Sequence, residues 1–386
     1  MRTPLARLIE VALAFLQARR RARWSRTQLE AYQPAPPQCP VETAAEFEEH
    51  FAARNSLKLS LAEARHHAER ELAGEPPAFS GYSLGLSTGS TGRPGVFLTS
   101  TRERHAWAGT ILAKFLPWRL LVGAEIALIL KHNNRLYANA GKRLHFFNAA
   151  APVASWIGRL CALQPDVLIG PPSVLEQVAR LASTPLKPRL LLAGAEPLFP
   201  QDRAFLMQAY GVAPRVIYQA KEGFLAAECA HGGIHLNEDL IHFERVPLGR
   251  GRFVPVITDF TRTSQTYRRF RLDDVLIESA KPCACRQPFA RVAAVEGRTQ
   301  DVLSLNNERL FPLEVNALLW PHLQGRDYRV TQLTADRVAL AVDGGAPVDA
   351  IDALSLHVQV TVEKYAPRAP GEKRRRIQRL FPDCEL

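Results

Sequence analysis

Long apolar runs are missing from this chain of 386 residues. No stretch approaches the about 20 consecutive apolar residues that a membrane-spanning helix needs, so no membrane span is expected. Residues 1–24, MRTPLARLIEVALAFLQARRRARW, resemble a secretory signal, but Glu10 interrupts the apolar part and arginines stand where a cleavage site would be. The sequence therefore predicts an amphipathic helix in this region.

Closely and regularly spaced cysteines are also missing, because the six cysteines are scattered along the chain. That spacing argues against a disulfide scaffold. Hydrophobic residues make up 47% and charged residues 23% of the chain, as in ordinary globular proteins. These features predict a cytoplasmic protein with a core large enough for two or three domains.

Acidic residues are fewer than basic ones, 38 against 49, and the net charge is +11. The basic residues concentrate in residues 19–23 and 373–376. Such a surplus suits nucleic acid, a phosphorylated ligand or an acidic partner, and a solvated basic face is an equally open reading of the N-terminal cluster. The chain has no zinc-finger, RNA-recognition or helix-turn-helix pattern, which argues against nucleic acid. No pattern assigns an oligomeric state.

A stretch rich in Gly, Ser and Thr, GLSTGSTGRPGVFLTS, covers residues 85–100. It is not a nucleotide loop of the GxxxxGK[ST] type, because no Lys follows Gly92. Residues 82–84 and 96–98 read as short strands, which favours a tight loop within a domain over a flexible linker. Backbone N–H and hydroxyl groups in such a loop can bind phosphate, and a purely structural turn is equally open.

Between residues 100 and 220, short apolar segments alternate with helical ones. The pattern predicts strands at residues 125–131, 167–170, 189–193 and 215–218, with helices at 103–116, 153–163, 173–181 and 201–210. This alternation is typical of an α/β domain with a mostly parallel sheet flanked by helices. Ligands are then expected at the carboxyl ends of the strands, where residues 170–172, 194–196 and 219–222 lie.

Other segments complete the outline. Residues 1–75 read as helical with a proline-rich break at 33–37, and Ser173 is a candidate helix cap. Strands are expected again at 253–259 and 274–278. The composition turns polar near residues 297–301, and the remaining about 85 residues are long enough for a small α+β domain.

Six segments, in order along the chain, resemble the motifs of one family. They are STGSTGRPG (87–95), AGAEPL (193–198), YQAKEGFLAAEC (218–229), RRFRLDDVL (268–276), EGRTQDVL (296–303) and GEKRRRIQR (371–379). Through them the chain resembles the adenylate-forming superfamily of acyl-CoA synthetases. Within it, the chain is most similar to the phenylacetate–coenzyme A ligase branch and its group of probable adenylate-forming enzymes.

The resemblance implies an ATP-dependent ligase that activates a carboxylic acid, an aromatic one by analogy with the branch, as an acyl-adenylate. The acyl group would then pass to the thiol of coenzyme A or of an acyl carrier protein. A large ATP- and acid-binding domain over residues 1–299 and a small mobile domain over 300–386 are also implied. The alternative is a non-catalytic nucleotide-binding protein of the same fold, which Lys221 and Gln300 suggest because the family pattern has other residues there.

The resemblance also assigns the nucleotide site. The phosphates of ATP would lie in the loop of Ser87, Thr88, Gly89, Ser90, Thr91 and Gly92. The adenine would lie beside Gly194, Ala195, Glu196 and Tyr218. The ribose would bind Asp274, and Arg298 would contact ribose or phosphate. From the residues alone, Tyr218 could equally be a core aromatic, and Arg298 could form a surface ion pair with Asp301.

Three further residues would act on the reacting groups. The resemblance gives Mg²⁺ to Glu222 and places Lys373 between the carboxylate and the α-phosphate, where a cation offsets their repulsion. Lys221 replaces the usual Thr as an additional cation in the site, and Gly95 stands where the loop often has Lys. The alternative interpretation of Lys373 is a solvated residue in an arginine-rich run.

A metal site is predicted from residue types. Cys229, His235, Cys283 and Cys285 offer three thiolates and an imidazole, the ligands that a structural Zn²⁺ prefers. His231 competes with His235 for the fourth position. Buried free thiols are the alternative reading.

Overall fold

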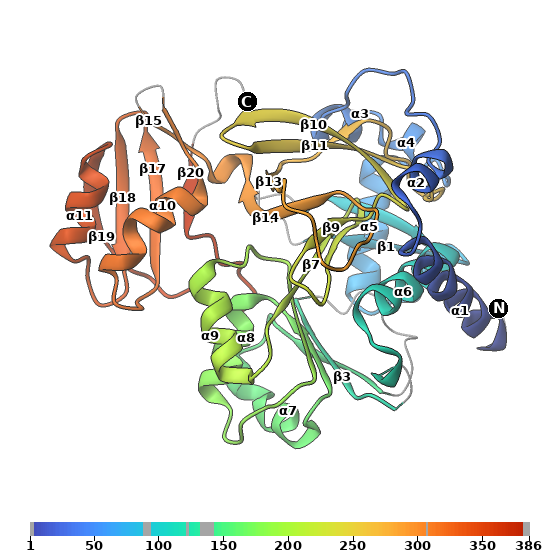
Figure 1. Ribbon diagram of the computed structural model, residues 1–386, viewed down its shortest axis with the longest axis horizontal. Coiled ribbons are helices and arrows are strands. Elements are labelled where there is room, and N and C mark those ends of the chain that lie inside the picture. Colours follow the sequence, from blue (N-terminus) through green and yellow to red (C-terminus); the bar gives the residue numbers. More distant parts are fainter. Residues whose placement is uncertain (1–3, 88–93, 121–122, 132–142, 306–307, 381–386) are drawn as a thin grey trace.

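The computed structural model describes residues 4–87, 94–120, 123–131, 143–305 and 308–380 (Figure 1). The chain forms a mixed α/β fold with a 12-stranded sheet, a four-stranded sheet near the C-terminus and flanking helices. The predicted α/β class is confirmed. None of the described helices is long and apolar enough to cross a bilayer.

Five helices precede the first strand: α1 (Pro4–Arg21), α2 (Arg26–Tyr32), α3 (Ala44–Glu49), α4 (Phe51–Arg54) and α5 (Leu61–Leu72). Three of them start at a Ser or Thr whose side chain caps the first turn, with a Gln or Glu returning the hydrogen bond: Ser25, Thr43 and Ser60. The helical character predicted for residues 1–75 is confirmed, and the predicted break at 33–37 separates α2 from α3.

Helix α1 lies against α6 (Thr101–Phe115) through a close contact at Gly109. A Cβ added at Gly109 would lie 2.3 Å from the carbonyl oxygen of Val11 and 2.8 Å from the Cβ of Ala14. The two backbones can approach this closely only because residue 109 has no side chain.

The Gly- and Ser-rich stretch joins two paired strands, β1 (Tyr82–Leu86) and β2 (Val96–Ser100). They run antiparallel, with Leu86 opposite Val96. The predicted position within one domain, between two short strands, is therefore confirmed, and the linker alternative is wrong; residues 88–93 themselves lie outside the described residues.

The parallel half of the large sheet has the strand order β4, β3, β5, β6, β7. Its strands are β3 (Ile126–Leu130), β4 (Leu144–Asn148), β5 (Val167–Gly170), β6 (Leu190–Gly194) and β7 (Arg215–Ala220). The helices between them are α7 (Ile157–Leu163), α8 (Pro172–Leu181) and α9 (Pro200–Tyr210). Four of the strands were predicted. The fifth, β4, was missed because it is an edge strand with one buried residue, Phe147, and therefore lacks a buried apolar run.

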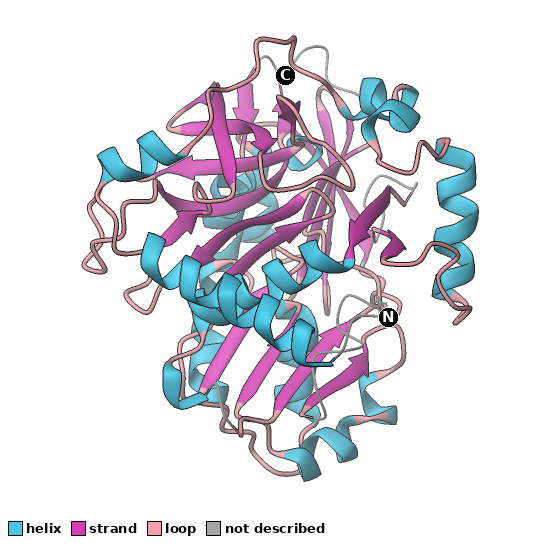
Figure 2. Cartoon of the chain, turned by 90° about the vertical axis from the view of Figure 1, so that its right-hand side faces the viewer, coloured by secondary structure: helices cyan, strands magenta, loops and turns pink. Residues whose placement is uncertain are grey.

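Beyond β7 the pairing becomes antiparallel, so the large sheet is mixed, and the prediction of a mostly parallel sheet holds only for its first half. The strands of this second half are β8 (Gly223–Glu228), β9 (Ile234–Leu236), β10 (Ile241–Gly249), β11 (Arg252–Asp259), β12 (Phe270–Arg271), β13 (Asp274–Glu278) and β14 (Arg291–Arg298). Figure 2 shows the strands of the sheets with helices packed beside them. The reversal of direction after β7 brings β13 and β14 to the side of the sheet that faces the C-terminal segment (Figure 1).

The last part of the chain forms a small α+β unit with a sheet in the order β19, β18, β17, β20. Its elements are β15 (Leu303–Leu305), β16 (Glu308–Leu310), α10 (Pro312–Leu319), β17 (Tyr328–Thr334), β18 (Arg337–Val342), α11 (Val348–Ser355), β19 (Gln359–Lys364) and β20 (Ile377–Arg379). The predicted small C-terminal α+β domain is confirmed. It has its own apolar core, to which the large domain adds Phe199. The exact boundary at residues 299 and 300 stays a prediction.

The contact between α1 and α6 can be tested with two glycine substitutions that differ in their surroundings. Gly109→Ala should destabilise the protein by about 1–3 kcal/mol, because the new methyl group overlaps the backbone of α1. Gly158→Ala in α7 should instead stabilise it by about 0.5–1 kcal/mol, because a Cβ there meets nothing within 4 Å. Denaturant unfolding measures both changes, and two changes of the same sign would contradict the description of this contact.

Candidate active site

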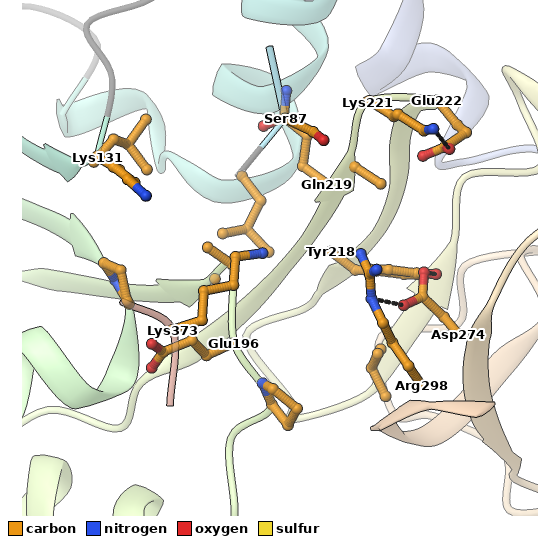
Figure 3. A pocket seen from close by; sticks show the side chains of 18 of the residues that line it. Ser87, Lys131, Glu196, Tyr218, Gln219, Lys221, Glu222, Asp274, Arg298 and Lys373 are labelled. Atoms are coloured by element: carbon orange, nitrogen blue, oxygen red, sulfur yellow. Dashed lines mark hydrogen bonds and ion pairs between the residues drawn. The ribbon is translucent and has the colours of Figure 1, made fainter. Parts of the chain in front are cut away.

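A pocket of about 460 Å³ lies where the carboxyl ends of the parallel strands face β13, β14 and the segment 371–375 (Figure 3). All three strand ends that the sequence singled out contribute to it: residues 170 and 171, 194–196 and 219–222. The pocket thus brings together the segments that resemble family motifs, although they are far apart in the chain.

One side of the pocket carries a hydrogen-bonded group of polar side chains. The Tyr218 hydroxyl donates to Oδ2 of Asp274 at 2.6 Å, and Nε of Arg298 lies 3.9 Å from Oδ1 of the same carboxylate. Burial, followed by the neighbouring Asp274 charge, raises the pKa of Tyr218 well above its ordinary value, so the hydroxyl remains a donor. The alternative ion pair of Arg298 with Asp301 is not found: Oδ1 of Asp301 pairs with Arg375 at 2.6 Å, and Arg298 reaches Oδ2 only through its backbone N–H, at 2.9 Å.

The foot of the Gly- and Ser-rich loop also opens into the pocket. The backbone N–H of Ser87 donates to the carbonyl of Gly95 at 2.8 Å, and the N–H of Gly95 donates to Oγ of Ser87 at 2.8 Å. This double contact closes the base of the loop. The remaining residues assigned to phosphate binding lie outside the described residues: Thr88, Gly89, Ser90, Thr91 and Gly92.

Lys221 and Glu222 occupy the turn from β7 to β8, facing that loop. Lys221 Nζ lies 3.7 Å from Oε1 of Glu222, and a Cβ added at Gly95 would be only 2.7 Å from the same Nζ. Burial raises the pKa of Glu222, while the charge of Lys221 acts in the opposite direction. The turn therefore presents one buried carboxylate and one ammonium group to the base of the loop.

Lys373 reaches the pocket from the small domain, on the segment between β19 and β20. Figure 3 shows its side chain extending into the pocket near Glu196. Burial, and then the charge of Arg298, lower the pKa of Lys373. The segment can approach the large domain because Gly371 has φ +75° and a Cβ there would lie 2.9 Å from Cα of Ala150.

Glu196 holds the chain next to Lys373. Its carboxylate accepts hydrogen bonds from the backbone N–H and hydroxyl of Ser173, at 3.2 and 3.0 Å, and from the backbone N–H of Arg374 at 2.8 Å. The prediction of Ser173 as a helix cap is wrong: Pro171 is the N-cap of α8, and the Ser173 side chain bonds Glu196 instead. The assignment of Glu196 to the nucleotide stays a prediction.

Two arginines that follow Lys373 are buried and paired, which corrects the solvated reading of this basic run. Arg374 bonds Glu176 through two 2.8 Å contacts and Asp202 at 2.6 Å. Arg376 bonds Asp202 at 2.7 and 2.9 Å and Asp327 at 2.9 Å. We call these five residues the arginine latch. Only Asp327 among the acids belongs to the small domain, so the latch joins the two domains.

The sequence analysis missed the acidic partners of the latch. Asp202 lies in the first turn of α9 and Glu176 within α8, and both sit in helical segments where a lone acid usually faces solvent. Asp202 is 3% exposed. These acids are identified only by their pairing with buried arginines, and the spacing of residues in the sequence does not reveal that pairing.

A second cluster lies outside the pocket, between the turn from β8 to β9 and the loop before β14. The ligand atoms of Cys229, His235, Cys283 and Cys285 all lie within 4.8 Å of one another. The Sγ atoms of Cys229 and Cys283 are 3.5 Å apart, and Sγ of Cys285 is 3.2 Å from Nε2 of His235. The competing His231 is exposed and is not in the cluster.

The imidazole of this cluster is oriented by the backbone. His235 Nδ1 lies 3.2 Å from the carbonyl oxygen of Phe289, so Nδ1–H can donate to it and Nε2 is left facing the thiols. Such an outer contact commonly fixes a metal-binding histidine. A Cβ at Gly233 would lie 2.7 Å from Sγ of Cys283 and 2.9 Å from Nε2 of His235, so the glycine leaves room for the cluster.

Comparison with known proteins finds ligases that resemble this chain in sequence and in fold. No family model matches the chain. In sequence, the chain is 26% identical over 240 residues to the phenylacetate–coenzyme A ligase of Aromatoleum evansii. The match covers 58% of this chain and 51% of that protein, so the chain spans about half the length of this curated relative. In structure, it is similar to 2-hydroxyisobutyryl-CoA ligase in the postadenylation state, with a TM-score of 0.64 and 19% identity, covering 97% of this chain and 89% of that chain. The chain is thus similar in sequence to one coenzyme A ligase and shares the fold of acyl-CoA ligases.

The fold is shared with further solved ligases. The same 2-hydroxyisobutyryl-CoA ligase in its thioesterification state is less similar to this chain, with a TM-score of 0.51, 20% identity and the same coverage of 97% and 89%. The anthranilate CoA ligase AuaEII in complex with anthranoyl-AMP gives a TM-score of 0.53 at 14% identity, covering 76% of this chain and 66% of that chain.

The latch makes a strong prediction for stability. Asp202→Ala leaves two buried guanidinium groups without their shared carboxylate and should destabilise the protein by about 3–5 kcal/mol. The control is Glu278→Gln, which breaks the exposed contact with Arg245 and should cost less than about 1 kcal/mol. Thermal and denaturant unfolding compare the two variants. A similar small effect of both would show that the latch contributes no more than a surface ion pair.

Proposed function

We propose that this protein activates a carboxylic acid with ATP, as an acyl-adenylate, and passes the acyl group to a thiol. The observation that carries the proposal is the position of Lys373, which enters the pocket from the small domain on a segment bonded to the large domain. The polar group of Tyr218, Asp274 and Arg298 on one side of that pocket suits a nucleotide.

The first step joins two anions, so the site has to offset their repulsion. A carboxylate oxygen attacks the α-phosphorus of ATP, the bond from that phosphorus to the bridging oxygen breaks, and pyrophosphate leaves with the electron pair. Lys373 holds a positive charge between the carboxylate and the α-phosphate as the bond forms. Asp274 accepts hydrogen bonds from the ribose hydroxyls, and Tyr218 keeps that carboxylate in place.

The foot of the phosphate loop supports the same reading. Ser87 and Lys221 lie where donors and positive charge would reach the β- and γ-phosphates. Glu222 fits Mg²⁺ in residue chemistry, because it is a buried carboxylate that lines the pocket, and carboxylate oxygens are ligands that Mg²⁺ prefers. When bound, Mg²⁺ would neutralise phosphate charge.

The acid is proposed to be aromatic and the acceptor to be coenzyme A or an acyl carrier protein. The pocket lining includes the apolar side chains of Trp107, Ile111, Leu128, Leu130 and Ile169, which suit a ring. The related ligase from A. evansii is named for phenylacetate and coenzyme A. Thiol transfer is proposed to follow movement of a small domain that begins near residue 300.

A non-catalytic nucleotide-binding protein is the second candidate, favoured by the close approach of Lys221 to Glu222 at 3.7 Å. The two candidates separate in an ATP–pyrophosphate exchange assay with a panel of aryl and aliphatic acids. If the protein is a ligase, ATP–pyrophosphate exchange should occur only when an acid of one class is present. Nucleotide binding without exchange for any acid would favour the second candidate.

Lys373→Ala should lower acid-dependent exchange by roughly 10²–10³, the usual cost of losing one charge-stabilising contact to a transition state. ATP binding, measured by calorimetry, should remain, because Lys373 acts where the acid meets the α-phosphate. Lys221→Ala is the competing variant. Full activity of Lys373→Ala together with inactivity of Lys221→Ala would show that Lys221 supplies the essential charge.

The pH dependence provides a second readout on Lys373. Its pKa is lowered by burial and by Arg298, so the ammonium loses its proton as the pH rises, and does so below the ordinary lysine range. Exchange activity should therefore fall on the alkaline side. Lys373→Arg keeps its charge over this range. It should be slow but free of that alkaline decline, whereas an unchanged profile would assign the decline to another group.

We also propose that the Cys/His cluster holds one structural Zn²⁺. The four donors fit, because three thiols and one imidazole can surround a Zn²⁺ with bonds of about 2.3 Å to sulfur and about 2.0 Å to nitrogen. Zinc-bound thiolates suit the reducing cytoplasm, where we propose that the protein resides.

The zinc proposal predicts about one equivalent of metal in protein purified without added zinc. Cys283→Ser should remove the metal and lower the melting temperature, because a structural zinc contributes its binding free energy to folding. The matched control is Cys161→Ser, outside the cluster, which should change neither the zinc content nor the melting temperature. Metal-free protein with unchanged stability in both variants would overturn the assignment.

A further inference from the structure

Helix α1 exposes a row of large apolar side chains that the proposed catalysis does not use. Leu8 is 68% exposed, Ile9 50%, Leu13 52% and Leu16 61%. We call these four residues the outer stripe. By helical spacing, Ile9, Leu13 and Leu16 lie on the side of α1 opposite Val11 and Ala14, which face α6, and Leu8 flanks that side. Exposed apolar patches of this kind on folded proteins usually mark an interaction site.

The outer stripe ends in positive charge. Ile9, Leu13 and Leu16 are followed at the same helical spacing by Arg20 and, just past the helix, by Arg23. Both arginines are exposed, and neither has a carboxylate partner among the residues that the structure describes. The stripe therefore changes along its length from apolar to basic.

An exposed tryptophan lies at the same basic end. Helices α1 and α6 run in the same direction, because Glu10 contacts His105 and, further along, Arg19 donates to the carbonyl of Leu116 at 2.6 Å. The residues after α6 therefore lie beside the end of α1. Among them Trp118 is 75% exposed, and its exposed neighbour is Arg119.

We propose that the outer stripe and this basic end dock the protein on a membrane surface rich in anionic lipid. Apolar side chains of a surface helix enter the boundary between headgroups and acyl chains, while arginines bind anionic headgroups and tryptophan prefers that interface. Here the apolar side chains and Arg20 share one side of α1, and Trp118 lies near its basic end. Figure 1 shows α1 at the edge of the molecule, away from the small domain, so docking leaves the small domain unobstructed.

Charge distinguishes this occupant from a second copy of the chain. Glu10 is the one acidic residue in the sequence of α1, and it bonds His105 on the inner side. A helix packed against the outer stripe of a second copy would bring no carboxylate to Arg20 or Arg23. Anionic headgroups supply that charge.

The test is sedimentation of the full chain with vesicles. Vesicles of phosphatidylcholine alone are compared with vesicles that contain phosphatidylglycerol, at low and high salt. We expect binding to the anionic vesicles only, weakened by salt because exposed charges are screened. Leu13→Ser with Leu16→Ser, and separately Arg20→Glu with Arg23→Glu, should each weaken binding by on the order of tenfold or more.

The matched control is Val348→Ser with Leu356→Ser on the small domain. These side chains are also large, apolar and exposed, but they lie at the two ends of α11, whose charged residues are acidic. This control should bind vesicles as the unmodified protein does. Circular dichroism and ATP binding check that each variant is folded, and both are independent of any acid activity.

Two outcomes overturn the proposal. The first is equal sedimentation of all variants, or no sedimentation with anionic vesicles. The second is a dimer, seen by analytical ultracentrifugation, that Leu13→Ser with Leu16→Ser dissociates while vesicles bind none of the proteins. That result would assign the outer stripe to contact between copies.

Discussion

Asp202 is bonded by two buried arginines at once, and the placement of the small domain depends on this arrangement. Burial alone would lower the pKa of Arg376, but the charge of Asp202 and its hydrogen bonds outweigh burial and raise that pKa. The carboxylate lies in the first turn of α9, where the helix dipole also favours negative charge. If the domains separated, the charged side chains of the latch would become hydrated. When the domains join, each of these side chains must pair with one of opposite charge. Such an interface favours one relative orientation over many.

The same arrangement fixes the reach of Lys373. A lysine on a mobile segment would sample many positions, because its ammonium group is carried by a flexible stem of four carbons. Here the next residue, Arg374, is bonded through its backbone to Glu196 and through its side chain to Glu176. Only the lysine side chain itself is left to move within the pocket. Positional precision at the active site thus comes from charges that do not touch the reacting groups.

The sequence allowed prediction of those features that depend on local pattern. Four parallel strands are short apolar runs bounded by Gly or Pro, and their ends marked the pocket correctly. The Cys/His cluster was predictable in residue type, whereas the choice of His235 over His231 depends on β9, which places His235 toward the loop of Cys283. The latch could not be predicted, because the partners of Arg374 and Arg376 lie up to 198 residues away. Edge strand β4 was not predicted, because only one of its residues is buried.

The close approach of Lys221 to Gly95 links two positions that are distant in the chain. A Cβ at 95 would come within 2.7 Å of Nζ and 2.9 Å of Cδ of Lys221, so a side chain at 95 requires the lysine side chain to turn aside. That movement is open to a flexible lysine, but it changes where the ammonium group lies relative to Glu222 and to the base of the loop. The residue at 95 therefore influences where the charge of residue 221 lies, and these two positions are expected to change together among relatives of this chain.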